Sequence, residues 1–436
     1  MFYEIKKIIV FIKNIFLHLL LSFGYIFNFP LCSALAIKLS LFKSKTFNFK
    51  KKKKNTLIIS YRTGGVDDIY QVFKNKPSNR KILFLDRKYL RKIFLYFHKD
   101  KKITHEKEFI FRSKYREFMK NLVFWLDFFE KDFLFLTFNF NYFEDVIFRE
   151  FAFKNGNICF LHFKESFRTK AEFKIHNDKS LHRYLKYFTR ISVYNHDTKK
   201  HFAKRLKNLS NKISVVGCPR ALFSFNLMKN IKKTKISNIL FYYFKKNKGM
   251  PVRNNKFNYF NETKIKKHKP ISWEPIINQI FDTMIKLSKV YPHINFFIKA
   301  KKGESENIRY INKIKKMNLP NLRYFNEGPG HHFLVNSQII IGMNSAAILE
   351  SLLAGKKVLI PHFSSFRKKI YNQYTFDLPK NLMVENRFHL EKILESNIKK
   401  GYINLPIKIK SYNKISKKYF GDFINSKKNL RKFLKC

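Results

Sequence analysis

The residues with the clearest chemical meaning in this chain lie around a short turn before a predicted helix. Asn344 or Ser345 is a natural N-cap for a helix that begins at Ala346, and Gly355 is a natural residue to end it. Unpaired N–H groups in the first turn of such a helix, together with its dipole, stabilise an anion such as a diphosphate. The turn therefore predicts a phosphate site, with Glu350 further along the helix where its carboxylate could reach ribose hydroxyls. The alternative is an ordinary capped helix with a solvated glutamate.

Two segments upstream of this turn carry further groups that suit a phosphate. Gly330 and His331 lie in a loop that precedes the same unit, and a small residue beside a histidine lets a nucleotide approach closely. Lys299 and Lys301 follow a predicted strand, where their amines could pair with phosphate oxygens. The competing interpretation of each segment is a surface loop in a lysine-rich protein.

The first half of the chain has a glycine pair directly after its first predicted strand. Gly64 and Gly65 follow Arg62, and two glycines permit positive φ and a close approach of backbone amides to a ligand. The spacing matches neither the dinucleotide-binding nor the P-loop pattern. Asp67 and Asp68 come next, and one of them is a candidate general base toward a hydroxyl; the alternative role for one of them is to cap the following helix.

A histidine, a lysine and a glutamate lie near the end of another predicted strand in the first half. His162, Lys164 and Glu165 form a candidate acid–base or acceptor-binding group. The cysteines, by contrast, are scattered singly, with no C-x-x-C pair and no Cys/His cluster at metal-ligand spacing. We therefore expect neither a disulfide framework nor a metal site.

Short apolar runs alternate with longer amphipathic stretches from residue 55 onward, which is typical of βαβ units around a parallel sheet. The runs predict strands in the first half at 57–61, 81–85, 133–138, 158–163, 191–194 and 213–216. They predict a second series at 239–244, 294–298, 322–325, 338–341 and 357–360. A helix between Pro275 and Pro292 belongs to this second series. We therefore expect an α/β fold with two Rossmann-like domains and a cleft between them.

The composition is strongly basic and aromatic. The 436 residues carry a formal net charge of +59, and 45% of them are hydrophobic, which excludes a disordered chain. Such a charge suggests nucleic acid or an anionic membrane. However, heavy use of Phe, Lys, Asn and Ile together is typical of AT-rich coding sequence, and neither zinc-finger spacing nor an RNP-like motif accompanies the charge. We expect a solvated lysine-rich surface and no specific nucleic-acid partner.

The N-terminal segment at 8–37 is mostly apolar. Lys13, His18 and Pro30 interrupt it, whereas a spanning helix needs about 20 uninterrupted apolar residues. The basic flanks suit an interfacial helix on an anionic leaflet. The alternative that the residues leave open is an apolar helix packed on the protein.

Motifs in both halves of the chain carry a family resemblance. The second half contains GPGHH at 328–332, IGMNSAAILE at 341–350 and LAGKKVLIP at 353–361, and the first half contains LHFKES at 161–166. With these motifs the chain resembles the two-Rossmann-domain glycosyltransferases called GT-B, and in particular bacterial surface carbohydrate biosynthesis proteins. In such proteins the Asn–Ser turn, the glutamate and the A-G-K-x-V-x-x-P ending belong to the donor-binding domain.

The resemblance implies a domain plan and an activity. It implies an acceptor domain at 51–230 and a nucleotide-donor domain at 231–410. The residues on either side add the apolar segment at 1–50, a candidate for membrane association, and a helical tail at 411–436. The implied enzyme transfers a sugar from a nucleotide-sugar donor to a glycan or lipid-linked acceptor in surface polysaccharide biosynthesis, at the cytoplasmic face of a bacterial membrane. It needs no metal or other cofactor. One departure is that PHFSSF at 361–366 lacks the second carboxylate that many GT-B enzymes carry near the donor.

Two alternative functions stay open. The same fold also serves nucleotide-sugar epimerases and polyol-phosphate transferases, because a fold does not fix a function. The other alternative is a non-catalytic basic protein that binds anionic lipid or nucleic acid.

Overall fold

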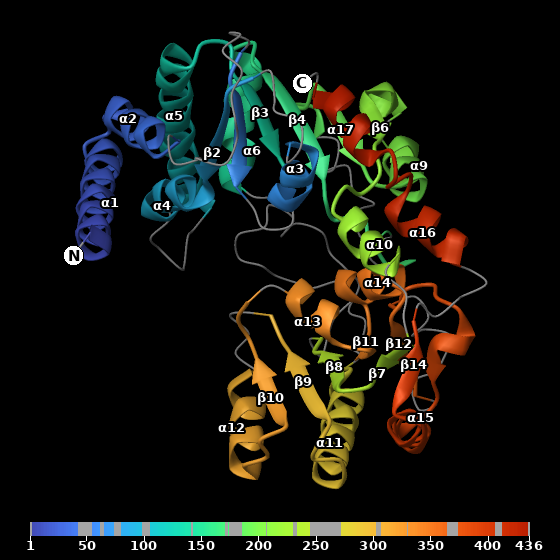
Figure 1. Ribbon diagram of the computed structural model, residues 1–436. Helices are drawn as coiled ribbons and strands as arrows, with labels where there is room; N and C mark the ends of the chain where they lie inside the picture. The colour runs from blue at the N-terminus through green and yellow to red at the C-terminus, as the bar shows by residue number, and fades with distance from the viewer. Residues whose placement is uncertain are drawn as a thin grey trace.

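The computed structural model describes residues 2–41, 55–61, 65–73, 80–97, 105–140, 143–170, 173, 185–205, 207–229, 233–244, 272–301, 307–328, 330–363, 374–405 and 412–434. These residues form two parallel sheets with helices on both faces, one sheet in each half of the chain (Figure 1). The predicted α/β fold with two Rossmann-like domains is confirmed.

The first sheet has six strands in the order β2-β1-β3-β4-β5-β6, and each pair is parallel. Its strands are β1 (Leu57–Tyr61), β2 (Ile82–Asp86), β3 (Leu134–Thr137), β4 (Ile158–Phe163), β5 (Arg190–Val193) and β6 (Ile213–Val215). Its helices are α3 (Gly65–Phe73), α4 (Arg87–Phe97), α5 (His105–Phe129), α6 (Phe143–Lys154) and α9 (His196–Arg205), with a short 3₁₀ helix, η1 (Lys207–Lys212). Each predicted strand is present within one residue at either end.

The second sheet has the order β10-β9-β8-β11-β12-β13 and is also parallel. Its strands are β8 (Asn238–Tyr242), β9 (Asn295–Lys299), β10 (Leu322–Phe325), β11 (Ile339–Gly342), β12 (Lys357–Pro361) and β13 (Met383–Val384). Its helices are α11 (Glu274–Val290), α12 (Asn307–Met317), α13 (Gly330–Asn336), α14 (Ala346–Leu353) and α15 (Arg387–Lys400), with a 3₁₀ turn, η4 (Lys380–Leu382). The sequence did not predict β13 or the antiparallel pair β7 (Lys233–Lys235) and β14 (Tyr402–Asn404).

The central strands were predictable because helices cover both faces of each sheet. A strand buried on both faces reads as a continuous apolar run. Leu57, Ile58 and Ile59 of β1 are all at most 1% exposed, and so are Ile339, Ile340 and Ile341 of β11. The two buried sheets therefore fix the positions of the loops that leave their carboxyl ends.

The chain crosses between the domains twice. It first passes along Val216–Arg220 into α10 (Ala221–Lys229), and α16 (Tyr412–Phe420) and α17 (Ser426–Leu434) then return to the first domain, where Figure 1 shows α17 beside the first sheet. The ring centroids of Phe433 and Phe160 lie 5.3 Å apart, and the Arg431 guanidinium donates to the Val72 carbonyl at 2.9 Å. The Cys218 N–H donates to the Phe420 carbonyl at 3.0 Å, so the two crossings are bonded to each other.

Gly421 makes the sharp turn after α16, and its replacement by alanine is expected to destabilise the domain junction. Its φ is +64°, and an added Cβ would lie 2.0 Å from the Tyr194 carbonyl oxygen. We expect Gly421→Ala to lower the free energy of unfolding by about 3 kcal/mol, through strain plus steric overlap. Gly401→Ala is the matched control, because φ there is +70° but nothing lies within 4 Å of the added Cβ; it should cost only about 1 kcal/mol. Equal losses in urea titrations would contradict this account of Gly421.

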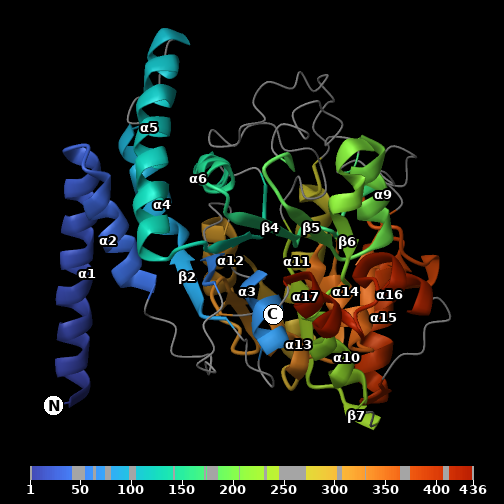
Figure 2. The same ribbon diagram turned by 90° about the horizontal axis from the view of Figure 1, so that it is seen from above.

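The N-terminal helices α1 (Phe2–Ile26) and α2 (Pro30–Leu41) form a hairpin at the edge of the first domain. Figure 2 shows α2 between α1 and α5. Ala34, Ala36 and Ile37 of α2 are fully buried and join the core of the first domain. The hairpin is therefore packed on the domain as part of its fold.

Candidate functional site

The segments that follow several strands of both sheets lie between the two domains. Figure 1 places α3, α10, α13 and α14 in this region. In open parallel sheets, ligands bind outside the carboxyl ends of the strands. The candidate side chains of the two domains can therefore be compared across one interdomain region.

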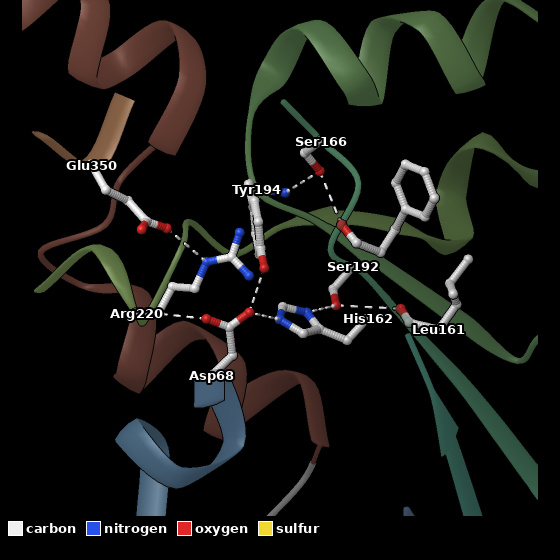
Figure 3. Close-up of polar contacts among 9 residues, drawn as sticks. Asp68, Leu161, His162, Ser166, Ser192, Tyr194, Arg220 and Glu350 are labelled. Carbon is white, nitrogen blue, oxygen red and sulfur yellow. Dashed lines mark hydrogen bonds and ion pairs between the residues drawn. The ribbon is translucent and has the colours of Figure 1, made fainter. Parts of the chain in front are cut away.

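Asp68, on α3, is the centre of a buried polar network (Figure 3). Its Oδ2 atom lies 3.1 Å from Nε2 of His162 and accepts a hydrogen bond from the Tyr194 hydroxyl. Its Oδ1 atom accepts the backbone N–H of Arg220 at 3.0 Å. The network continues from Nδ1 of His162 to the Ser192 hydroxyl at 2.8 Å. One carboxylate thus joins α3, the ends of β4 and β5 and the first interdomain crossing.

The environment of Asp68 keeps its carboxylate ionised. Burial alone raises the pKa, but the hydrogen bond from His162, the charge of Arg220 and the hydrogen bond from Tyr194 together hold the pKa of Asp68 below its usual value. Asp68 and His162 are both 0% exposed. Because solvent does not reach them, we assign these two residues to holding the elements in place, and a substrate would have to contact other groups.

Arg220 and Glu350 connect this network to the second domain. Nε of Arg220 lies 3.2 Å from Oε1 of Glu350, which α14 carries. The guanidinium also lies over the rings of Phe167 and Tyr194, at 5.5 and 5.7 Å from their centroids. Burial raises the pKa of Glu350, and the Arg220 charge partly offsets this effect. Glu350 is therefore a partly buried carboxylate with a cationic partner, and its side chain is still 24% exposed.

Asp67, next to Asp68, is exposed and points about 100° away from it around α3. Its charge acts on two groups of the second domain, because it raises the pKa of both His331 and Glu350. For His331 the larger effect is burial, which keeps the pKa of its imidazole below the usual value. The His331 ring also packs 5.4 Å from that of Phe223 on α10. An exposed carboxylate of one domain thus lies within electrostatic range of a histidine and a glutamate of the other.

The turn before α14 has the predicted cap, and its asparagine side chain is held by the protein. The Ser345 hydroxyl accepts the Ala347 N–H at 3.3 Å, which confirms Ser345 as the N-cap of the helix that starts at Ala346. Asn344 has a φ of +51°; its side chain donates to the Tyr374 carbonyl at 2.5 Å and accepts the Phe376 N–H at 3.0 Å. The Asn344 side chain therefore secures the neighbouring segment.

The other predicted donor-side residues differ in accessibility. Gly330 begins α13, and its carbonyl accepts the Tyr242 hydroxyl at 2.8 Å. Lys299 is only 8% exposed, donates to the Ala300 carbonyl at 2.6 Å, and has a pKa lowered by burial. Lys301 is exposed after the end of β9. Of the two predicted lysines, Lys301 is the one whose amine is accessible to a ligand.

The remaining predicted residues of the first domain lie apart from this network or outside the described residues. Glu165 is exposed beyond β4, and its carbonyl accepts Nε of Arg168 at 2.7 Å. Gly65 begins α3, where an added Cβ would lie 2.2 Å from the Phe138 ring. Arg62 and Gly64 lie outside the described residues. Across the part of the chain that the structure describes, no group of three or more His, Cys, Asp or Glu side chains is placed to hold a metal ion.

Sequence reasoning left Ser192, Tyr194 and Arg220 out of the candidate site. Ser192 and Tyr194 lie within the predicted strand at 191–194, so their position at a strand end was available as a signal. Arg220 closes the link between the domains, where a charged residue next to a proline is unremarkable in a lysine-rich chain. Tyr194 and Arg220 matter because they contact Asp68, 126 and 152 residues away in the sequence, and Ser192 joins the network through His162.

No family model and no curated protein matches this chain. Among solved structures, a putative UDP-N-acetylglucosamine 2-epimerase from Listeria monocytogenes matches with a TM-score of 0.51 at 11% identity, covering 88% of this chain and 98% of its own. UDP-GlcNAc 2-epimerase from Neisseria meningitidis, bound to UDP-GlcNAc, gives 0.49 at 13% identity, with 87% and 98% covered. The wall teichoic acid polymerase TagF matches with a TM-score of 0.47 at 10% identity, covering 97% of this chain and 96% of its own. The match at 0.51 and the two parallel sheets show that the chain has the GT-B fold.

Proposed function

We propose that this protein is a glycosyltransferase that uses a nucleotide-activated sugar in surface polysaccharide biosynthesis. The observation that carries the proposal is that ionisable groups of the two domains meet between them: Arg220 pairs with Glu350 of the second domain at 3.2 Å, and Asp67 is exposed on α3 of the first. A transferase needs a base for the acceptor and groups for the leaving nucleotide on opposite sides of one cleft. The resemblance of the motifs at 328–332 and 341–361 to surface carbohydrate enzymes supports the same function.

In this proposal the second domain holds the donor. The diphosphate lies against the first turn of α14, at Ser345 and Ala346, where backbone N–H groups and the helix dipole stabilise its charge. His331 approaches it from α13 and Lys301 from the segment after β9, and Glu350 contacts the ribose hydroxyls. Asn344 contributes by fixing the turn through its bonds to Tyr374 and Phe376.

The first domain holds the acceptor and begins the reaction. Asp67 takes the proton of the acceptor hydroxyl, whose oxygen forms a bond to the anomeric carbon of the sugar. The bond from that carbon to the diphosphate oxygen breaks, and the nucleoside diphosphate leaves with the electron pair, stabilised by the groups on α14. His162 acts indirectly by positioning α3 through Asp68, and the exposed Glu165 lies where it could contact the acceptor. No metal or other cofactor takes part in this scheme.

The acceptor in this proposal is a glycan or a lipid-linked glycan at the cytoplasmic face of a membrane. Nucleotide sugars and lipid-linked intermediates of surface polysaccharide meet there. The resemblance of the motifs to surface carbohydrate enzymes supports this location.

A nucleotide-sugar epimerase is the second candidate function. The observation that favours it is the fold match at a TM-score of 0.51 to a putative UDP-N-acetylglucosamine 2-epimerase. An epimerase converts the donor with no acceptor present, whereas a transferase leaves the sugar of the donor unchanged until an acceptor is added. Product analysis with a labelled donor, with and without acceptor glycan, separates the two functions.

A thermal-shift screen against UDP, GDP, CDP, CMP and their sugar conjugates tests the proposed donor site. We expect one nucleotide to raise the melting temperature, because saturation at 100 times the Kd adds about 2.7 kcal/mol to the free energy of unfolding. Glu350→Gln should weaken the shift for that nucleotide by removing the carboxylate from the proposed ribose site. Glu395→Gln, on the outer helix α15, is the matched control and should keep the full shift. If no nucleotide stabilises a folded sample, the donor-site proposal is wrong.

A further inference from the structure

Helix α1 presents an apolar face to solvent along most of its length. The segment Ile8–Ile26 is long and apolar enough to cross a membrane, yet only 17% of it is buried. The core helix of a soluble protein would be mostly buried, so packing inside the protein does not account for this segment. The exposed apolar side chains surround the N-terminal half of the helix and follow one face of its C-terminal half; they are 43% to 65% exposed and comprise Ile5, Ile8, Ile9, Val10, Phe11, Ile12, Ile15, Phe16, Leu19, Phe23 and Ile26. A contiguous apolar surface of this kind marks an interaction site.

The opposite face of the C-terminal half of α1 is fixed to the first domain. Leu17 and Leu21 are at most 1% exposed. Gly24 approaches α2 so closely that an added Cβ would lie 2.1 Å from the Ser33 hydroxyl oxygen. In both views α1 forms the edge of the molecule, with its outer side away from every other labelled element (Figures 1 and 2). The helix therefore lies along the side of the domain, and insertion across a bilayer would break these contacts.

The charges around the open face are positive. Lys13 is exposed in the middle of α1, and Arg91 and Lys92 are exposed on α4, which contacts α1 through a 3.2 Å hydrogen bond between Lys92 Nζ and Nδ1 of His18. Glu4 is the one acidic residue within α1. A lysine amid apolar residues can keep its amine at the headgroups while its stem stays in apolar surroundings. An apolar face with a basic border complements the surface of an anionic bilayer.

From this combination we propose that α1 is an interfacial anchor that binds the protein to the surface of an anionic lipid bilayer. The helix lies parallel to the membrane, with Phe11 and Phe16 below the headgroups and Lys13 and Arg91 among them. This goes beyond the proposed glycosyl transfer, because the anchor would act whatever reaction the cleft performs. It would bring the cleft close to acceptors that carry a lipid.

Vesicle flotation of the full-length chain tests the anchor. We expect the protein to float with vesicles of phosphatidylglycerol and phosphatidylethanolamine, and more weakly with phosphatidylcholine alone. Phe11→Glu with Phe16→Glu should reduce the bound fraction about ten-fold or more, because two apolar side chains are lost from the interface and two like charges meet the lipid. The matched control is Phe388→Glu with Phe223→Glu, at exposed phenylalanines of α15 and α10, which makes the same change in charge away from α1. Equal binding of the two double variants would overturn the proposal.

Two further measurements separate the anchor from its alternatives. Phe16→Trp should show a blue-shifted emission on vesicles and quenching by shallowly brominated lipid, above the wild-type background from Trp125 and Trp273. Release by alkaline carbonate is expected for an interfacial helix, so resistance to extraction would overturn the parallel orientation. A second copy of the chain would cover the face instead if the wild type bound no lipid and formed a dimer without vesicles, and if the α1 double variant were a monomer. No donor is present in these assays, so their failure leaves the proposed reaction untouched.

Discussion

Replacing Asp67 by asparagine is expected to reduce kcat for sugar transfer by about 10²- to 10³-fold, in the range that general-base catalysis contributes. The amide keeps the size of the side chain but cannot accept the proton of the acceptor hydroxyl. Because donor groups lie on the other domain, KM for the nucleotide sugar should change by less than about three-fold. Initial rates at saturating acceptor, together with the nucleotide-dependent thermal shift, measure the two effects separately.

The matched control for this variant is Asp282→Asn. Asp282, on α11, is an aspartate whose side chain is 41% exposed; it pairs with Lys313 of α12 at 2.8 Å and lies outside the proposed cleft. It should leave kcat unchanged. If Asp67→Asn retains full turnover while binding nucleotide normally, Asp67 is not the base, and the exposed Glu165 becomes the next residue to test.

The strands and the cap of α14 were predictable because their signals are local. A strand buried on both faces needs a continuous apolar run, and a serine before a helix can bond the N–H two residues on. Hence β1, β4 and β10 begin and end at the predicted residues, and Ser345 caps α14. These features depend on a few neighbouring residues, which the sequence displays directly.

The roles of Asp67 and Asp68 could not be separated from the sequence, because they depend on distant contacts. Adjacent residues of a helix point about 100° apart, so Asp67 and Asp68 lie in different surroundings. His162 and Tyr194 decide which of the two is buried, since they meet Asp68 across 94 and 126 residues. The left-handed conformation of Asn344 and its bonds to residues 374 and 376 are equally nonlocal. The sequence predicted that polar residues follow the first strand. Contacts between distant segments determine that Asp68 is buried and Asp67 is exposed.

Arg220 couples the buried network to the second domain. Asp68 accepts its backbone N–H, while its guanidinium pairs with Glu350 on the other domain. The position of α14 relative to α3 therefore depends on a carboxylate that no substrate needs to touch. A change at Asp68 should reach the cleft through Arg220, in addition to its effect on folding.

Replacing Asp68 by alanine is expected to lower the free energy of unfolding at pH 7 by about 3 to 5 kcal/mol, the cost of removing one partner from a buried charged network. His162, the Tyr194 hydroxyl and the Arg220 N–H would all lose their acceptor inside the protein. Asp282→Ala, which breaks only an exposed ion pair, should cost less than about 1 kcal/mol. Urea titrations of both variants measure the difference.

The pH dependence of this loss identifies the ionised carboxylate as its source. The pKa of Asp68 is lower in the folded protein than its usual value, so the folded state favours the carboxylate. Its stabilisation is fully present above the unfolded pKa of about 3.9, and it disappears as the pH falls through the lower folded value. The gap between wild type and Asp68→Ala should therefore narrow in acid. In a Tyr194→Phe background the same substitution should cost less, by about 0.5 to 3 kcal/mol, since the hydroxyl that depends on Asp68 is already absent. A gap that is constant with pH would instead mean that packing alone explains the loss.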